Sequence, residues 1–494
     1  MALSATIKTP LVSFTQPLGL YIDGQWVRGQ SGQTFETINP ATEEVVAAVH
    51  EATAEDIDLA VNAARRAFRN GWSTTAPTER GKLLLKLAEL VESHIEVLSA
   101  IESLDNGKPL KLARSDVLSA ASCLRYYGGW ADKVHGQTID TDPSFLNYTR
   151  HEPIGVCGQI IPWNFPFLMW AWKIGPALAT GNTVVLKTAE QTPLSGLYGA
   201  LLCHEAGVPP GVVNVVVSGF GAVAGAAIAA HMDVDKIAFT GSTLVGRRIL
   251  EASAKSNLKK VTLELGGKSP NIVFDDADVE RAVDWVNNGI YFNHGQCCCA
   301  GSRIYVQEGI YDAFIKAFKK RAAANVVGDP FDENTFQGPQ ISQLQFDRIM
   351  GYIKSGREQG ATVEVGGQRH GEEGSGFFIQ PTIFSNVTPG MKIMQEEIFG
   401  PVCAVQRFST EEEVVRMGND SIYGLAAGIH TTNVSRAIRV ANALHAGTVW
   451  INNYNSLSPQ VPFGGFKQSG IGRELGEYAL SNYTQVKAVR MLLD

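Results

Sequence analysis

Residues 236–246 read KIAFTGSTLVG, and this stretch decides the fold class of the chain. A strand-forming run ends at Thr240, Gly241 permits a tight turn, and Ser242 can cap a following helix. The same alternation recurs upstream, where strands are predicted at 156–161, 183–187 and 212–217 and helices at 193–205 and 222–231. Strands that alternate with helices predict βαβ units and a parallel sheet, whose carboxyl edge is where nucleotide cofactors bind.

A second alternation lies further along the chain. It begins near Ser269, with strands predicted at 271–274, 302–307 and 447–452 and helices at 279–287 and 310–323. The pattern therefore predicts a second α/β domain, with a boundary near Leu265-Gly266-Gly267. The segment 371–376, GEEGSG, is typical of a small exposed loop.

The N-terminal part is expected to be mainly helical. Apolar residues recur every three or four positions over 54–69 and 78–103, and Thr53 and Thr78 are the predicted N-caps. Short strands at 20–28 and 45–50 are expected to form a minor sheet. The composition of the first 19 residues favours a loose tail.

Composition excludes several classes of protein. The 494 residues are 45% hydrophobic and 18% charged, which indicates a globular chain of two or three domains. With 42 basic and 49 acidic residues the net charge is -7, which argues against binding to nucleic acid or an anionic membrane. Seven cysteines and no secretory signal predict a reducing, cytoplasmic location. The apolar stretch 212–230 contains several glycines and polar residues, so a strand, a turn and a buried helix are expected there, not a membrane span.

Three consecutive cysteines, Cys297, Cys298 and Cys299, invite a chemical interpretation. In extended backbone Cys298 faces away from the other two, so the three cannot converge on one point. A zinc site needs four convergent ligands and only His294 is nearby, so no metal is expected. A nucleophilic thiol and a set of small buried hydrophobic residues both remain open.

Two polar residues follow predicted strands. Glu264 ends an apolar run and precedes two glycines, so burial would raise its pKa and suit it to general acid–base work. The alternative is a strand Glu that faces solvent or pairs with Lys268. Asn164 lies between two prolines in Ile160-Ile-Pro-Trp-Asn-Phe-Pro-Phe167, where a rigid amide can serve in an oxyanion hole or simply cap its own turn.

Two glycine-containing turns compete as phosphate cradles. One is the Gly241 turn, which lacks the middle glycine of the usual dinucleotide fingerprint, and the other is Gly219-Phe-Gly221, whose next glycine comes one residue late. Glu190, which follows the strand at 183–187, is the candidate for binding ribose hydroxyls. A carboxylate there would repel a 2′-phosphate, which favours NAD and leaves NADP as the weaker alternative.

Taken together and in this order, the motifs strongly resemble the aldehyde dehydrogenase superfamily. The matching residues run from about Tyr21 to the C-terminus. They are Pro162-Trp163-Asn164-Phe165-Pro166, Lys187 with Glu190, Phe239-Thr240-Gly241-Ser242-Thr243, Leu263-Glu264-Leu265-Gly266-Gly267-Lys268, Gly295-Gln296-Cys297-Cys298-Cys299, Glu396-Glu397-Ile398-Phe399-Gly400-Pro401 and Pro462-Phe463-Gly464-Gly465. The cysteine triplet and the segment 472–477 are most similar to the class 1/2 branch.

The resemblance implies a mechanism. Cys298 is the nucleophile that attacks the aldehyde carbon, and the Asn164 amide with the Cys298 backbone N–H binds the oxyanion. Hydride transfer to NAD leaves a thioester, and Glu264 activates the water that hydrolyses it to the carboxylic acid. Lys173 and Glu474 align with a proton relay behind Glu264. An offset of 34 residues between Glu264 and Cys298 (298 − 264) fits the class 1/2 pattern.

The resemblance also assigns binding residues. Those expected around the cofactor are Ile161, Trp163, Lys187, Glu190, Gly221, Phe239, Gly241, Ser242, Gly246, Leu265, Glu397 and Phe399. Those expected along the substrate tunnel are Ser119, Phe165, Leu168, Met169, Trp172, Phe292, Cys297, Cys299, Leu457 and Phe463. This lining is apolar and aromatic, which suits aliphatic and aryl aldehydes over charged ones. Ser119 stands where a mitochondrial acetaldehyde-type enzyme carries Met, so we expect a wider tunnel that admits arylacetaldehydes beside acetaldehyde.

The implied architecture has three parts. An NAD-binding domain is expected at 1–132 and 153–266, a catalytic domain at 267–470, and an oligomerisation region at 133–152 and 471–494. The hairpin at 133–152 is expected to be joined by a C-terminal strand near 484–491. Such a protruding strand needs a covering subunit, and a homotetramer is implied, with a dimer as the alternative.

Three other functions remain to be weighed. One is a dehydrogenase specialised for a single bulky aldehyde. A CoA-acylating relative generally lacks the general-base glutamate, so Glu264 argues against it. A structural relative without turnover has no need for Cys298, Glu264 and Asn164 together.

Overall fold

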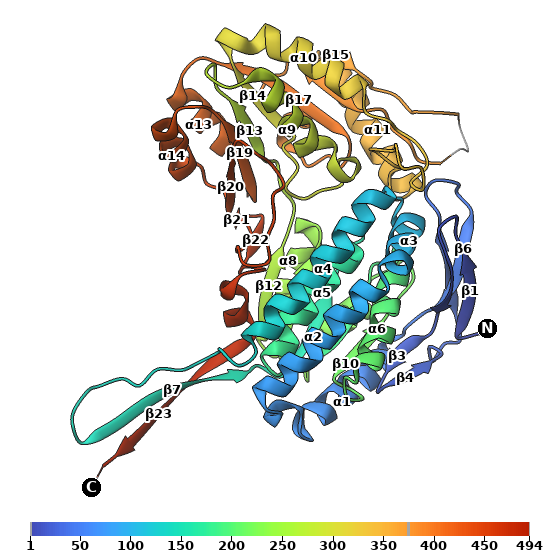
Figure 1. Ribbon diagram of the computed structural model, residues 1–494, viewed down its shortest axis with the longest axis vertical. Coiled ribbons are helices and arrows are strands. Elements are labelled where there is room, and N and C mark those ends of the chain that lie inside the picture. The colour runs from blue at the N-terminus through green and yellow to red at the C-terminus, as the bar shows by residue number, and fades with distance from the viewer. Residues whose placement is uncertain (1, 373–375, 494) are drawn as a thin grey trace.

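The computed structural model describes residues 2–372 and 376–493, and within them two open β-sheets with covering helices dominate (Figure 1). Residues 373–375 of the loop predicted at 371–376 lie outside the described part. The first sheet has the order β22-β12-β11-β8-β9-β10-β3-β4, and its five central strands, β12 to β10, are parallel. Their bounds are Gly470–Ile471, Lys260–Glu264, Lys236–Thr240, Val156–Ile160, Thr183–Lys187, Val213–Val216, Leu20–Ile22 and Gln25–Val27. The parallel sheet predicted from the sequence is confirmed.

The order of the central strands creates a crevice. Along the chain β8, β9 and β10 build one side of the sheet, and β11 then returns to the other side of β8. Connections therefore leave the carboxyl ends of β8 and β11 in opposite directions, which is where open α/β sheets bind ligands. The connecting helices are α5 (Pro166–Ala179), α6 (Leu194–Ala206), α7 (Val223–Ala230) and α8 (Thr243–Lys255).

Both faces of this sheet are buried. In β9, Val184 and Leu186 pack into one hydrophobic cluster, while Val185 between them packs into another. The first cluster includes α2, α4, α5 and α6, which lie side by side in Figure 1, and the second includes α1, α7 and α8. A strand buried on both faces explains why these segments are almost entirely apolar. The N-terminal helices are α1 (Ala54–Arg69), α2 (Pro77–Ser93), α3 (Ile95–Asn106) and α4 (Leu110–Trp130).

The second sheet has the order β15-β16-β17-β14-β13-β19-β20 and is parallel except for β15. Its strands are Thr362–Val365, Thr382–Ser385, Val402–Phe408, Arg303–Gln307, Pro270–Val273, Ala426–His430 and Thr448–Ile451. Its helices are α9 (Val279–Tyr291), α10 (Tyr311–Ala323), α11 (Gln343–Glu358), α12 (Lys392–Gln395), α13 (Glu411–Asn419) and α14 (Val434–Ala443). The chain passes from the first sheet to the second between β12 and β13, beside Leu265-Gly266-Gly267, and β22 returns to the first sheet.

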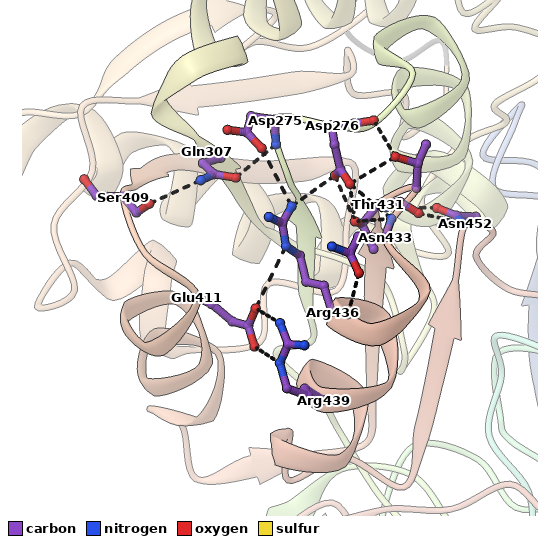
Figure 2. A network of polar contacts seen from close by, with 11 residues as sticks. Asp275, Asp276, Gln307, Ser409, Glu411, Thr431, Asn433, Arg436, Arg439 and Asn452 are labelled. Carbon is purple, nitrogen blue, oxygen red and sulfur yellow. Dashed lines mark hydrogen bonds and ion pairs between the residues drawn. The ribbon is translucent and has the colours of Figure 1, made fainter.

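A polar network ties the carboxyl ends of β13 and β19 to α14 (Figure 2). Arg436 Nη1 lies 3.2 Å from Asp276 Oδ1 and 3.7 Å from Asp275 Oδ1. Asp276 also accepts hydrogen bonds from the Thr431 hydroxyl at 2.8 Å and from the Asn433 backbone N–H at 3.1 Å. Burial alone would raise the pKa of Asp276, but hydrogen bonds from Thr431 and Thr432 and the charge of Arg436 outweigh it and lower the pKa, so the carboxylate stays ionised.

A two-stranded arm protrudes from the molecule, with the C-terminus near its tip (Figure 1). β7 (Phe145–Pro153) pairs antiparallel with β23 (Thr484–Leu492), as the resemblance implied. Backbone hydrogen bonds from Ile139 to Asn147 and from Thr149 to Gln137 close the hairpin that begins after α4. Val486 and Leu492 on β23 are 63% and 64% exposed, so the arm leaves apolar surface uncovered.

Four predictions for the N-terminal part are wrong. The helix predicted at 78–103 is two helices that break at His94, and Ala76 stands at the N-cap in place of Thr78. The expected loose tail contains β1 (Ser4–Lys8) paired with β2 (Ser13–Pro17). The strands predicted at 20–28 join the first sheet through β3 and β10, whereas β5 (Thr34–Ile38) and β6 (Val45–His50) pair only with each other in a sheet of two.

Candidate active site

Strand ends from the first sheet and a loop from the second meet at one cavity of about 840 Å³. Glu264 is the last residue of β12, Asn164 follows β8, and Cys298 lies in the loop before β14. All three line the cavity. The structure therefore brings together three residues that are 34 to 134 positions apart in the sequence (298 − 264 and 298 − 164).

The expectation that Cys298 faces away from the other two cysteines is wrong, because the backbone here is a turn and not a strand, and all three cysteines line the cavity. The sulfurs of Cys297 and Cys299 lie 3.4 Å apart and both residues are buried, whereas Cys298 is partly exposed. Contact with the Cys297 sulfur is the main cause that raises the pKa of Cys298, and burial adds to it. The Cys298 thiol therefore holds its proton in the free chain, and its attack on a substrate needs a base.

Glu264 is a buried carboxyl group, 7% exposed, and no described residue hydrogen-bonds its Oε2. Burial, followed by the charge of Glu474, raises its pKa well above the usual value. A carboxyl with this environment, facing the same cavity as a thiol, has the properties of a general acid–base group. Its predicted pairing with Lys268 is absent from the described ion pairs, and burial with the charge of Arg303 lowers the pKa of Lys268 to about 7.

Lys173 and Glu474 form a buried ion pair behind Glu264. Lys173 Nζ on α5 lies 2.6 Å from Glu474 Oε1 and donates to the Thr240 hydroxyl at 2.8 Å. Neither member of the pair lines the cavity, but Thr240 does. The pair is close enough to Glu264 to act on its pKa, with Glu474 raising it and Lys173 lowering it.

Asn164 is held firmly in place. Its side-chain Nδ2 donates a hydrogen bond to the backbone carbonyl of Gln296 at 3.0 Å. The backbone carbonyl of Asn164 accepts a hydrogen bond from Asn293 Nδ2 at 3.0 Å. An amide nitrogen carries two N–H groups, so one remains for the cavity that Asn164 lines. Its alternative role, capping its own turn, does not appear among the hydrogen bonds of the described residues.

All ten predicted tunnel residues line this cavity. Aromatic pairs form its walls: Phe165 stacks on Phe292 with ring centroids 6.0 Å apart, and Trp172 meets the edge of Phe463 at 5.6 Å. Ser119 reaches the cavity from α4. The full set of predicted wall residues found there is Ser119, Phe165, Leu168, Met169, Trp172, Phe292, Cys297, Cys299, Leu457 and Phe463.

The predicted cofactor residues fall into two groups. Trp163, Gly241, Ser242, Leu265, Glu397 and Phe399 line the cavity, whereas Ile161, Lys187, Glu190, Gly221, Phe239 and Gly246 lie outside its wall. Lys187 Nζ lies 3.4 Å from Glu190 Oε2 at the end of β9. The other turn that competed as a phosphate cradle, Gly219-Phe-Gly221, is tied to Glu51, which accepts the Gly219 N–H at 3.0 Å.

The donor set at this edge of the sheet fits a dinucleotide. Ser242 caps α8 by accepting the Val245 N–H, and the other N–H groups of the first turn of α8 have no intrahelical acceptor, which suits a diphosphate. Glu397 accepts the Gly267 N–H at 3.0 Å and supplies a carboxylate, and Phe399 packs edge-on against Trp163. In contrast, no group of three or more His, Cys, Asp or Glu side chains within 2–372 and 376–493 could hold a metal ion.

Several wall residues were missed from the sequence. Gln345 and Arg348 on α11 line the cavity, and Gln345 Nε2 donates to the Phe399 carbonyl at 2.8 Å. Asp116 on α4 also lines it and forms a short, buried ion pair with Lys108. The sequence around these helix residues contains no motif that marks them as part of a site, because only the packing of distant segments brings them to the cavity.

None of the helices described is sufficiently long and apolar to cross a bilayer. A family model described as "Aldehyde dehydrogenase family" matches residues 26–489. An aldehyde dehydrogenase of Aspergillus niger is 68% identical over 492 residues, which are 99% of this chain and 98% of that protein. An aldehyde dehydrogenase of Emericella nidulans is 66% identical over 491 residues, with the same coverage of 99% and 98%. Among solved structures, the NAD+ complex of an aldehyde dehydrogenase from Bacillus cereus has a TM-score of 0.95 and 53% identity, covering 97% of each chain.

Proposed function

Because this chain belongs to the aldehyde dehydrogenase family, we propose that it oxidises aldehydes to carboxylic acids with NAD, as a member of the class 1/2 branch. The observation that carries the proposal is the convergence of Cys298, Glu264 and Asn164 on one cavity. A nucleophile, a base and an oxyanion donor are the three groups that oxidation through a thioester requires.

NAD, when bound, supplies the acceptor for the hydride of the substrate. The residues that would hold its diphosphate are Gly241 and Ser242 at the start of α8, with Gly246 in the following turn. Lys187 and Glu190 would bind the ribose hydroxyls on the adenosine side, and Glu397 those beside the nicotinamide. NAD in the Bacillus cereus relative supports this choice of cofactor, and the Glu190 carboxylate supports NAD over NADP because it would repel a 2′-phosphate.

The chain's own residues carry the acylation. The ionised Glu264 carboxylate takes the proton of the Cys298 thiol as the sulfur bonds to the aldehyde carbon, and the carbonyl oxygen becomes an oxyanion. The free N–H of Asn164 Nδ2 and the Cys298 backbone N–H stabilise that charge. When the carbon loses its hydride, the oxyanion collapses to a thioester on Cys298.

Glu264 carries the hydrolysis. Its ionised carboxylate takes a proton from a water molecule, whose oxygen attacks the thioester carbon. The carbon–sulfur bond then breaks, the acid leaves, and the sulfur takes this proton back from Glu264 as the Cys298 thiol. The proton taken from the thiol during acylation passes from Glu264 to the Glu474 carboxylate of the buried pair before hydrolysis, so Glu264 is ionised again when the water is activated. A general base at this position supports hydrolysis over transfer of the acyl group to CoA.

The tunnel supports apolar aldehydes as substrates. Its walls are aromatic and aliphatic, and an apolar site of this volume suits aliphatic and aryl groups. Ser119 on α4 leaves space that a longer side chain would fill. We therefore propose broad activity that extends to arylacetaldehydes, and specialisation for one bulky aldehyde is the alternative.

The arm of β7 and β23 supports assembly. Its exposed strands and apolar side chains need cover from another subunit, which supports an oligomer, and we propose the homotetramer with a dimer as the alternative. Cysteines in the described structure are all free, including a pair of sulfurs only 3.4 Å apart, and this supports a reducing, cytoplasmic location.

The proposed function is tested by following NADH and acid formation with NAD and aldehydes from acetaldehyde to indole-3-acetaldehyde. We expect turnover with both small and bulky aldehydes and none in Cys298→Ala. Ser119→Met should raise KM for the bulky aldehydes by about tenfold, the scale of a steric misfit in an apolar pocket, and leave acetaldehyde nearly unchanged. Turnover in Cys298→Ala would refute the thiol mechanism, and a strict preference for one bulky aldehyde would favour the specialised enzyme.

A further inference from the structure

Three consecutive residues beside the active-site loop lie in the left-handed region of backbone space. Their φ angles are +50° at Asn293, +59° at His294 and +71° at Gly295. Glycine adopts such angles freely and Asn tolerates them, but a run of three is costly and persists only when its surroundings enforce it. Such strain collects at functional sites, so the turn calls for a functional explanation.

The surroundings do enforce this turn. His294 is fully buried, and its Nδ1 accepts the Gly338 N–H at 2.7 Å. A Cβ atom on Gly295 would lie 2.1 Å from the Gly400 carbonyl oxygen, so only glycine fits there. The next residue, Gln296, accepts the Ile341 N–H through its side chain at 3.0 Å.

The result of the turn is the position of the Asn293 side chain. Its Nδ2 donates to two backbone carbonyls, that of Asn164 at 3.0 Å and that of Gln296 at 3.1 Å. Two carbonyl oxygens can only face the NH₂ end of the amide, so its orientation is fixed. No described residue bonds the buried Asn293 Oδ1, which indicates that the residue is used for its donors.

Asn164 completes a closed set of contacts. Its own Nδ2 donates to the same Gln296 carbonyl at 3.0 Å. That bond uses one N–H and sets which way the second points. Asn293 thus ties the segment after β8, which carries Asn164, to the loop of the second sheet that carries Cys298.

We propose that Asn293 is a positioning residue for the oxyanion pocket, holding the Asn164 amide in register with the Cys298 backbone N–H. This inference rests on the proposed function. Asn293 is fully buried and does not line the cavity, so it acts through Asn164 and not on the substrate. A donor displaced by a fraction of an ångström loses most of its effect on a developing charge.

The test is a double-mutant cycle on the rate of NADH formation in a single turnover at saturating aldehyde and NAD. Asn293→Gly keeps the left-handed backbone and removes the two donors. We expect a loss of about 10- to 100-fold, smaller than the about 100- to 1,000-fold loss for Asn164→Ala, with KM little changed. In the Asn164→Ala background the same Asn293 change should have almost no effect, because the amide it positions is gone.

Two further measurements separate positioning from general damage. Alkylation of Cys298 by iodoacetamide should proceed at the same rate in Asn293→Gly as in the unmodified chain, since the thiol is untouched. The matched control is Asn287→Ala. Asn287 lies on α9 and is also fully buried, but its side-chain amide bonds Asn325 and not Asn164. This variant should keep the normal single-turnover rate. If Asn293→Gly does not fold, Asn293→Asp is the second variant, because it has the same size and replaces the donor by an oxygen.

The outcomes are distinct. The positioning role would be overturned if the rate losses of the two single variants multiplied in the double variant. An equal rate loss in Asn287→Ala, or a normal rate in Asn293→Gly, would overturn it as well. If the unmodified chain forms no NADH from any aldehyde, the proposed function fails and this inference fails with it. Normal turnover by the unmodified chain, together with an Asn293→Gly effect that disappears in the Asn164→Ala background, supports both the proposed function and the positioning role.

Discussion

At the scale of single residues, the environment of Glu264 determines how the enzyme should respond to pH. Burial raises the pKa of this carboxyl, so it is protonated at a pH where an exposed glutamate is already ionised. Only the ionised form can take a proton from water. The rate of acid release from preformed acyl-enzyme should therefore rise as pH increases through the raised pKa.

The stability effect of Glu264 has the opposite sign. Because the folded pKa exceeds the unfolded one, the folded chain binds this proton more tightly. The stabilisation is fully present below the unfolded pKa of about 4.3 and is lost as pH rises through the folded pKa. Glu264→Gln should remove this pH-dependent acid release, leaving at most slow uncatalysed hydrolysis, and should show a smaller loss of stability at alkaline pH, measured by stopped-flow and by thermal melts. A wild-type profile that falls as pH rises would contradict the assignment.

Residue types alone made Cys298, Glu264 and Asn164 candidates but left a structural alternative open for each. Their roles follow from the resemblance of the combined motifs to the aldehyde dehydrogenase superfamily, and neither source indicates how the parts are held. Asn293 was not a candidate, since an Asn before His and Gly predicts at most a turn. Its role depends on a carbonyl 129 residues away, and no local pattern carries that information.

At the scale of elements, strands that are buried on both faces were predictable and helix breaks were not. The bounds of β9 and β11 match the predicted runs, because continuous apolar sequence between turn signals has one structural solution. The break at His94 carries no Gly or Pro, and α2 and α3 both pack on the same cluster, so the apolar period continues through it. The start of α1 was predicted from Thr53 ahead of the apolar period, and in the structure Thr53 and Asp56 form a capping box there.

The network in Figure 2 yields a prediction about α14. Arg436 is the cation shared by Asp275, Asp276 and Glu411, and its guanidinium also packs over the Phe274 ring at 4.7 Å. Arg436→Met leaves these carboxylates without their shared cation. We expect a loss of about 1–2 kcal/mol, from hydrogen bonds to charged groups, seen as a melting temperature lower by a few degrees with kcat unchanged.

The neighbouring arginine provides the control for this prediction. Among the described residues, Arg439 forms an ion pair with Glu411 alone, at 2.9 Å, and its side chain is 59% exposed. Exposed ion pairs contribute little, so Arg439→Met should leave the melting temperature nearly unchanged. Equal melting temperatures for the two variants would show that the network does not hold α14 in place.

At the scale of the whole molecule, the arrangement of the two sheets explains why the site lies where it does. The first sheet contributes Glu264 and Asn164 from the ends of β12 and β8, and the second contributes Cys298 from the loop before β14. The sequence predicted two α/β units and their order. It could not predict that β3 and β4 extend the first sheet or that the N-terminal residues form a hairpin, because the sequence of a short strand does not indicate which strand it pairs with.

The arm gives a prediction about assembly. Truncation after Tyr483 removes β23 and leaves β7 without its partner. If the arm joins subunits, sedimentation velocity should show the proposed tetramer replaced by smaller species. Removal of residues 493–494 alone, which leaves β23 intact, is the control. An unchanged sedimentation coefficient after the longer truncation, corrected for the lost mass, would assign the subunit contacts elsewhere.

The central claim is a thioester on Cys298 that Glu264 hydrolyses, and one measurement on Glu264→Gln tests it directly. The variant is mixed with NAD and aldehyde, NADH is followed in the first turnover, and the protein is then digested for mass spectrometry. We expect one NADH per active site, no steady turnover, and the acyl mass on the peptide that carries Cys298. Steady turnover in this variant, no burst of NADH, or an acyl group on another residue would contradict the account.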